Sequence, residues 1–271
     1  MEVSAPFSGE RRNGRSCYTS RAVARADYDR MAADYDRGRG LSPETLEAWR
    51  AALGRYLPPE TGLPVLDLGS GTGRFAGALA EWFGADVIAV EPSSGMRREA
   101  RRNASHPRVT YVGGTAESIP FRDGCCDTAW LSTVIHHIEN LRACARELRR
   151  VLRPGGPVLI RSAFPGRLDG ITLFRFFPEA QRFAETCPSV EATVEAFAYA
   201  GFEMESLEAV PQVLAPSLTV FCDRVRLRAD SGLASLSDDE FARGMRALER
   251  AAAEETAPRP VTDRLDLLAL R

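Results

Sequence analysis

The chain contains no lysine, so all 35 of its basic residues are arginine. Schiff-base chemistry and lysine general bases are therefore excluded. The 37 acidic residues nearly balance the arginines and leave a formal net charge of −2, so no overall charge directs the protein toward nucleic acid. The sequence also lacks any apolar run of membrane-spanning length, and no membrane span is expected.

Cysteine pairs with metal-binding spacing are missing as well. Of six cysteines, only Cys125 and Cys126 lie close in sequence, and they are adjacent rather than spaced as CxxC. We therefore expect no metal site, and scattered cysteines indicate a reducing compartment. The first sixteen residues carry arginines but no hydrophobic segment of a signal peptide. We predict a disordered start over residues 1–19 and a cytoplasmic location.

Short apolar segments alternate with amphipathic segments between residues 58 and 163. Strands are expected at 64–68, 86–90, 108–112, 127–131 and 157–161, and helices at 73–83, 93–103 and 140–152. Apolar strands that alternate with helices predict a parallel sheet covered on both faces. The fold class is therefore α/β.

The flanking segments interrupt this rhythm. Residues 20–57 predict N-terminal helices, and residues 164–188 an irregular lid rich in phenylalanine, proline and glycine. A core helix and a sixth strand are expected over 189–213, a helical cap insertion over 214–258 and a final strand over 259–271. Phe174, Phe176 and Phe177 either line an apolar pocket or form the core of the lid.

The sharpest motif follows the first expected strand, in the segment VLDLGSGTGRF at residues 65–75. Its glycines, Gly69, Gly71 and Gly73, let the backbone approach a ligand at the carboxyl end of a strand. A dinucleotide fingerprint would place its third glycine at position 74, which is arginine. Asp67 beside this loop can hold an ammonium group. Glu91, twenty residues after Gly71, either accepts hydrogen bonds from two ribose hydroxyls or is a solvated acid.

Four further segments follow in order. They are GTAESIPF at 114–121, CDTAWLSTVIHHI at 126–138, LRRVLRPGG at 148–156 and the segment at 197–202 that ends in AGF. Together with the glycine loop, they resemble the motifs of class I S-adenosylmethionine-dependent methyltransferases of type 11. That group includes ubiquinone/menaquinone-type and natural-product O-methyltransferases. The resemblance covers about residues 28–201.

The resemblance implies a Rossmann-like seven-stranded sheet in the order 3-2-1-4-5-7-6, with strand 7 antiparallel and helices on both faces. It implies S-adenosylmethionine as cofactor and S-adenosylhomocysteine as product. The implied cofactor-binding residues are Tyr35, Asp67, Gly69, Ser70, Gly71, Thr72, Gly73, Glu91, Pro92, Met96, Thr115, Ala116, Glu117, Leu131 and Ser132. Thr115 stands where the family often has aspartate, so a hydroxyl would replace the usual carboxylate at the adenine. Residues 20–57 either close over the cofactor or pack on the domain edge.

The implied reaction is in-line methyl transfer to O, N or C of a small-molecule metabolite. His136 and His137 follow the fourth strand and are the catalytic candidates, since histidine titrates near neutrality and suits proton removal. Local packing beneath the cofactor is the other interpretation of the pair. The expected partner is a small-molecule methyl acceptor and not nucleic acid, and the expected state is a monomer or homodimer.

Three alternatives stay open. One is a methyltransferase-fold protein without transfer activity, acting as a cyclase or binding scaffold. Another is an NAD(P)-dependent oxidoreductase, which the glycine spacing and the absence of a Tyr-x-x-x-Lys pair disfavour. The third is methylation of RNA or protein, which the balanced charge disfavours.

Overall fold

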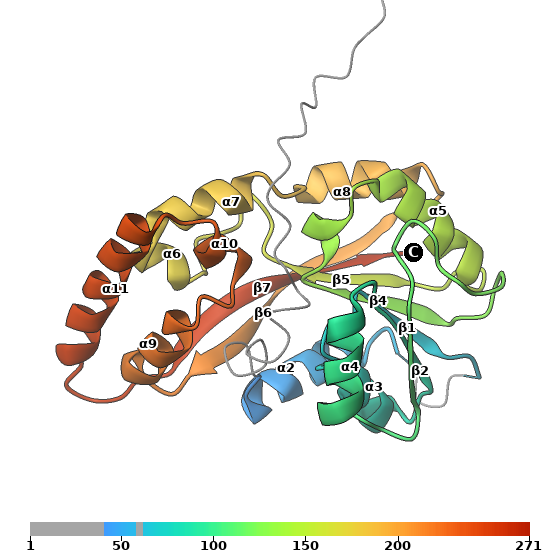
Figure 1. Ribbon diagram of the computed structural model, residues 1–271. Coiled ribbons are helices and arrows are strands. Elements are labelled where there is room, and N and C mark those ends of the chain that lie inside the picture. Colours follow the sequence, from blue (N-terminus) through green and yellow to red (C-terminus); the bar gives the residue numbers. More distant parts are fainter. Residues whose placement is uncertain (1–40, 58–61) are drawn as a thin grey trace, which may run out of the picture.

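The computed structural model describes residues 41–57 and 62–271. Its centre is a seven-stranded sheet in the order β3-β2-β1-β4-β5-β7-β6 (Figure 1). The strands are β1 (Val65–Leu68), β2 (Val87–Val90), β3 (Val109–Val112), β4 (Thr128–Ser132), β5 (Val158–Ser162), β6 (Met204–Ala215) and β7 (Val261–Leu270). Strand β7 runs antiparallel to both β5 and β6, whereas the first five strands are parallel. The strand order and the antiparallel seventh strand predicted from the sequence are confirmed.

Helices cover both faces of the sheet, because strands such as β1 and β5 are buried along their whole length. One apolar layer joins the sheet to α5 (Leu141–Val151) and α8 (Val190–Ala198). The opposite layer contains α2 (Pro43–Leu53) and α3 (Ala76–Phe83). Trp130 of β4 lies at its centre, with its ring centroid 5.8 Å from that of Trp49 and 5.2 Å from that of Phe75. Helix α4 (Ser94–Asn103) follows β2.

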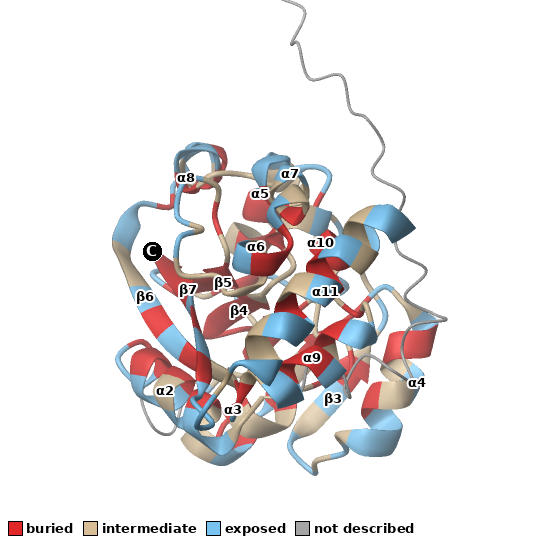
Figure 2. Cartoon of the chain, turned by 90° about the vertical axis from the view of Figure 1, so that its left-hand side faces the viewer, coloured by how far each residue is buried: buried red, intermediate tan, exposed pale blue. Residues whose placement is uncertain are grey.

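Strands β6 and β7 are much longer than the others, with 12 and 10 residues against four or five. Their extra length extends beyond the ends of the other strands and supports a helical cap, at the left of Figure 1. The cap consists of α6 (Leu173–Phe176), η2 (Pro178–Ala180), α7 (Gln181–Glu185), α9 (Leu218–Arg226), α10 (Ser231–Ala234) and α11 (Asp238–Ala253). All of these helices except α7 contribute buried residues to one apolar core. Figure 2 shows the buried strands behind cap helices whose outer faces are exposed.

Several local predictions need correction. The helix expected from residue 73 begins at Ala76, because Gly73 has a left-handed φ of 81° that a helix cannot contain. Strand β6 continues to Ala215, two residues past the segment 189–213 expected to contain it, and Pro211 fits because β6 is an edge strand. The lid expected to be irregular contains the short helices α6, η2 and α7.

The remaining expectations divide between what the structure describes and what it does not. Phe176 and Phe177 belong to the cap core, and Phe174 packs against that core and also lines a cavity described below. Tyr35, the disordered start expected over 1–19 and the helix expected before residue 41 lie outside the described residues. Within residues 41–57 and 62–271, no helix is long and apolar enough to cross a membrane.

Candidate functional site

The glycine loop after β1 holds three left-handed residues, Gly69, Gly71 and Gly73, with φ of 72°, 56° and 81°. A Cβ at Gly69 would overlap the Val134 side chain, and one at Gly73 would overlap the Tyr111 hydroxyl. A Cβ at Gly71 would have no atom within 4 Å. Gly69 and Gly73 are therefore required by packing within the protein, and Gly71 faces open space.

Asp67 is the buried acid beneath this loop, with 2% of its surface exposed. Burial, and then the negative charge of Glu91, raise the pKa of Asp67 to about 7, while Arg74 opposes the shift. Among the described residues, Asp67 Oδ2 and Ser70 Oγ are buried without a hydrogen-bond partner. An orphaned buried carboxylate oxygen is costly, so this position calls for a donor from a ligand.

Glu91 connects the end of β2 to the glycine loop. Its Oε2 accepts a hydrogen bond from the Gly71 N–H at 3.0 Å, and its Oε1 accepts one from the Ser93 N–H at 2.8 Å. Each carboxylate oxygen has a second lone pair. The carboxylate can therefore fix the loop and still accept hydrogen bonds from a ligand.

A cavity of about 680 Å³ lies over this loop and is called the loop cavity here. The predicted site residues that line it are Asp67, Gly69, Ser70, Gly71, Thr72, Glu91, Pro92, Met96, Thr115, Ala116, Glu117, Ser132 and His137. Gly73 and Leu131 do not line it, since Gly73 packs on Tyr111 and Leu131 is buried in the apolar layer beside α5. The sequence reasoning missed Leu68, Arg74, Phe75, Ser93, Gly114, Thr133, Val134 and Ile138. All eight lie within two positions of a predicted site residue.

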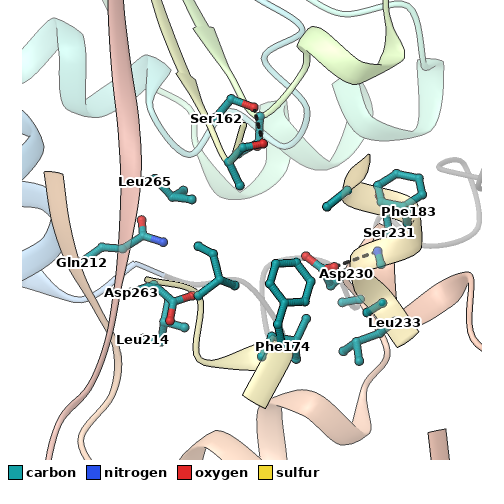
Figure 3. Close-up of a pocket in the computed structure, with 18 of the residues that line it drawn as sticks. Ser162, Phe174, Phe183, Gln212, Leu214, Asp230, Ser231, Leu233, Asp263 and Leu265 are labelled. Atoms are coloured by element: carbon teal, nitrogen blue, oxygen red, sulfur yellow. Dashed lines mark hydrogen bonds between the residues drawn. The ribbon is translucent and has the colours of Figure 1, made fainter. Parts of the chain in front are cut away.

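A second cavity of about 210 Å³ lies between the sheet and the cap and is called the cap cavity (Figure 3). Its walls are mainly apolar, with Phe174, Phe183, Leu214 and Leu265 among them. The two cavities share two lining residues, Arg74 and Thr133, so they adjoin there. Thr133 has a φ of 53°, which is strained for a β-branched residue.

The central part of the chain matches a known protein family. Residues 66–160 match the family model described as a methyltransferase domain, of type 11. A demethylmenaquinone methyltransferase of Clavibacter sepedonicus is 37% identical over 137 residues, which cover 50% of this chain and 56% of the relative. Residues 66–160 form a class I, type 11 methyltransferase domain. The class is S-adenosylmethionine-dependent, as the motifs implied.

Two further similarities agree with this. A malonyl-acyl-carrier-protein O-methyltransferase of Pectobacterium atrosepticum is 31% identical over 155 residues, covering 57% of this chain and 58% of the relative. The chain thus spans about half the length of these curated relatives. A solved structure from Anabaena variabilis, described as a methyltransferase of an antibiotic biosynthesis pathway, has a TM-score of 0.68 at 21% identity. It covers 85% of this chain and 100% of its own, and the likeness concerns the fold.

The two catalytic candidates, His136 and His137, line different cavities. They lie in η1 (Ile135–His137), one turn of 3₁₀-helix after β4, with ring centroids 4.0 Å apart. Successive side chains of such a helix point about 120° apart. His136 lines the cap cavity and meets the Phe183 ring edge-on at 5.8 Å, whereas His137 lines the loop cavity.

A buried polar row crosses the sheet beside the cap cavity. Arg161 of β5 donates to Ser132 Oγ at 3.2 Å and to Gln212 Oε1 at 2.5 Å. Its guanidinium carbon lies 5.0 Å from the centroid of the Trp49 ring. The sequence reasoning missed this row. The only available signal was an arginine inside the apolar strand at residues 157–161, where a charge needs a structural reason.

Proposed function

We propose that the protein is an S-adenosylmethionine-dependent methyltransferase that transfers a methyl group to O, N or C of a small molecule. The observation that carries the proposal is the pair of adjoining cavities. One lies over the glycine loop and its two acids, and the other is apolar and lies beneath the cap. Their common boundary at Arg74 and Thr133 is where a methyl donor and an acceptor would meet.

The loop cavity offers a complementary group for each part of the cofactor. The orphaned Asp67 oxygen suits the ammonium, and Glu91 suits the ribose hydroxyls. Thr115, Ala116 and Glu117 line the part of the cavity assigned to the adenine. When bound, the cofactor supplies a methyl group already activated as a sulfonium.

In this proposal, His136 rather than His137 removes the acceptor proton. Its ring lines the cap cavity, where the acceptor atom would stand, and a base must lie within hydrogen-bond reach of the proton that it takes. With the cofactor bound, the acceptor atom would take the methyl group as the bond from that methyl to the sulfonium sulfur breaks and the neutral thioether leaves as S-adenosylhomocysteine. The proton of the acceptor would pass to the His136 ring. His137 lines the loop cavity and is assigned to cofactor binding.

The test has two stages. Calorimetry with S-adenosylhomocysteine should show binding, and absence of binding would refute the cofactor assignment. Transfer of a labelled methyl group from S-adenosylmethionine to a panel of phenols, amines and activated carbon acids then tests turnover. Cofactor binding without transfer to any acceptor would instead support the alternative of a cyclase or binding scaffold.

The protein's setting is part of the same proposal. The cap cavity of about 210 Å³ supports a small-molecule acceptor, and the balanced charge supports the absence of a nucleic-acid partner. A monomer or homodimer in the cytoplasm completes the proposal. Light scattering coupled to size-exclusion chromatography would measure the oligomeric state.

A further inference from the structure

Gln212 of β6 and Asp263 of β7 form a polar pair in the wall of the cap cavity. They are direct partners in the antiparallel register, so their side chains lie on the same face of the sheet. Cβ atoms of such partners are about 4.5–5.5 Å apart. Both residues line the cavity, yet each is only 5% exposed. They are therefore inner-wall groups rather than surface groups.

The orientation of the Gln212 amide is fixed by Arg161. Because the Arg161 guanidinium can only donate, the Gln212 atom 2.5 Å from it must be the oxygen Oε1. The amide nitrogen Nε2 consequently points away from Arg161, and Figure 3 shows it directed toward the cavity. No hydrogen bond joins Nε2 to any residue in the described part of the chain. The cavity wall thus presents an N–H donor that is more than nine-tenths buried.

Asp263 supplies an acceptor beside this donor. Its Oδ1 accepts a hydrogen bond from the Thr172 N–H at 2.8 Å, which holds the carboxyl group in place. Burial raises the pKa of Asp263 above its ordinary value, as expected for a carboxyl group on an apolar wall. The second carboxyl oxygen retains lone pairs for a ligand.

A hydroxyl group satisfies both members of this pair, since it accepts from Gln212 and donates to Asp263. An ammonium group would be attracted by the carboxyl groups of Asp263 and Asp230, but it has no lone pair for the Gln212 N–H and would face the Arg161 charge. A carboxylate would be repelled by Asp263. Much of the remaining wall is apolar, with Phe174, Phe183 and Leu214, and suits an apolar body, although Arg224 and Asp230 also line the cavity.

We propose that Gln212 and Asp263 bind a hydroxyl group of an uncharged, largely apolar methyl acceptor. That this molecule is a methyl acceptor rests on the proposed function, but that such a molecule binds in the cap cavity does not. Gln212 and Asp263 are specificity residues that select the substrate, and His136 acts on the atom that is methylated. The cavity volume of about 210 Å³ suits a body of one or two fused rings.

Equilibrium dialysis with fluorescent naphthalene probes tests the pair directly. 2-Naphthol carries both donor and acceptor, 2-methoxynaphthalene only an acceptor, and 2-naphthylmethylamine a cationic donor. We expect 2-naphthol to bind about tenfold more tightly than either of the others, because each of those leaves a buried polar group without a partner. Equal affinities, tighter binding of the amine, or no binding of 2-naphthol would overturn the proposal.

Two substitutions exchange the roles of the pair. Gln212→Glu keeps an oxygen for Arg161 and replaces the N–H donor by an acceptor. Asp263→Asn keeps an oxygen for the Thr172 N–H and replaces the acceptor by a donor. Each single variant should bind 2-naphthol about tenfold more weakly than the wild type.

The double variant has the same net charge as the wild type and again presents one donor and one acceptor. Because a hydroxyl can reverse its hydrogen bonds, the double variant should recover 2-naphthol affinity to within about threefold of the wild type. A merely structural role for the pair would give additive losses instead, and that result would contradict the proposal. Asp239→Asn, on the exposed surface of α11, is the matched control for loss of one acid and should change nothing.

Failure of this proposal can be separated from failure of the proposed function. The dialysis is run without cofactor, and S-adenosylhomocysteine binding is measured for every variant by calorimetry. Unchanged cofactor affinity together with altered naphthol affinity supports hydroxyl binding by Gln212 and Asp263, independently of the proposed function. Loss of both affinities in a single variant indicates misfolding, and the double variant then decides the question. Recovery of 2-naphthol binding in the double variant supports hydroxyl binding by Gln212 and Asp263, and no recovery contradicts it.

Discussion

Asp67 should make cofactor binding depend on pH near neutrality. Its carboxyl group has a pKa of about 7 in the ligand-free protein, because burial and Glu91 disfavour the charged form. An ammonium ligand needs the charged form, which amounts to about 90% of the molecules at pH 8 and about 10% at pH 6. We therefore expect the affinity for S-adenosylhomocysteine to fall about tenfold between pH 8 and pH 6.

Calorimetry at both pH values measures this change, and two variants show where it originates. Asp67→Asn removes the titrating group, so it should bind more weakly at pH 8 and lose the tenfold dependence. Asp127→Asn removes a different buried acid, which pairs with Arg153 outside the loop cavity, and should keep the dependence. A tenfold dependence that persists in Asp67→Asn would refute the reasoning.

The raised pKa of Asp67 has the opposite effect on the stability of the ligand-free protein, which falls as the pH rises. A raised pKa means that Asp67 stabilises the fold below its ordinary pKa of 3.8 and that this contribution is lost as pH rises through about 7. The upper limit of that loss is about 4 kcal/mol, since one pKa unit corresponds to about 1.4 kcal/mol. Asp67→Asn should therefore raise the Tm of the ligand-free protein at pH 8 while it weakens cofactor binding.

Three further variants test other parts of the site and cap. Gly71→Asn should abolish S-adenosylhomocysteine binding, whereas Gly84→Asn, at a similar φ of 61° and also with open space around it, should leave calorimetric affinity unchanged. His136→Ala should lower kcat by about 100-fold or more without altering cofactor affinity; His137→Ala should change the affinity, and equal effects would contradict the division of roles. Phe177→Ala should cost about 3–5 kcal/mol in chemical denaturation, because Phe177 is fully buried in the cap core; a loss under about 1 kcal/mol would contradict this.

Most residues that line the loop cavity could be predicted because they lie close together along the chain. Asp67, the glycine loop and Glu91 stand at the ends of β1 and β2, and parallel neighbouring strands bring such ends together. Gly73 belongs to the glycine loop, but glycine is needed there because a Cβ would overlap the Tyr111 hydroxyl. The two positions are distant in sequence, so the glycine spacing does not reveal this contact. Leu131 was expected at the site from its motif, yet strand alternation directs it into the apolar layer.

The polar pair of the cap cavity could not be predicted in the same way. Gln212 and Asp263 are 51 residues apart in sequence and meet only through the register of β6 and β7. Neither belongs to a motif, and a single polar residue in a strand pattern is normally a solvent-facing position. The two histidines were also equivalent in sequence, and the geometry of one 3₁₀ turn separates them.

This difference has a simple physical origin in the division of the chain. Every residue that lines the loop cavity lies between positions 67 and 138, inside the matched domain of residues 66–160. Most of the cap cavity, from Arg161 to Leu265, lies beyond that domain, on the strand extensions and cap helices. In the proposed function, the domain would therefore bind the methyl donor, while β6, β7 and the cap would select the acceptor. Resemblance to relatives over the domain bears on the proposed methyl donor, whereas only the geometry of the cap cavity bears on the proposed acceptor.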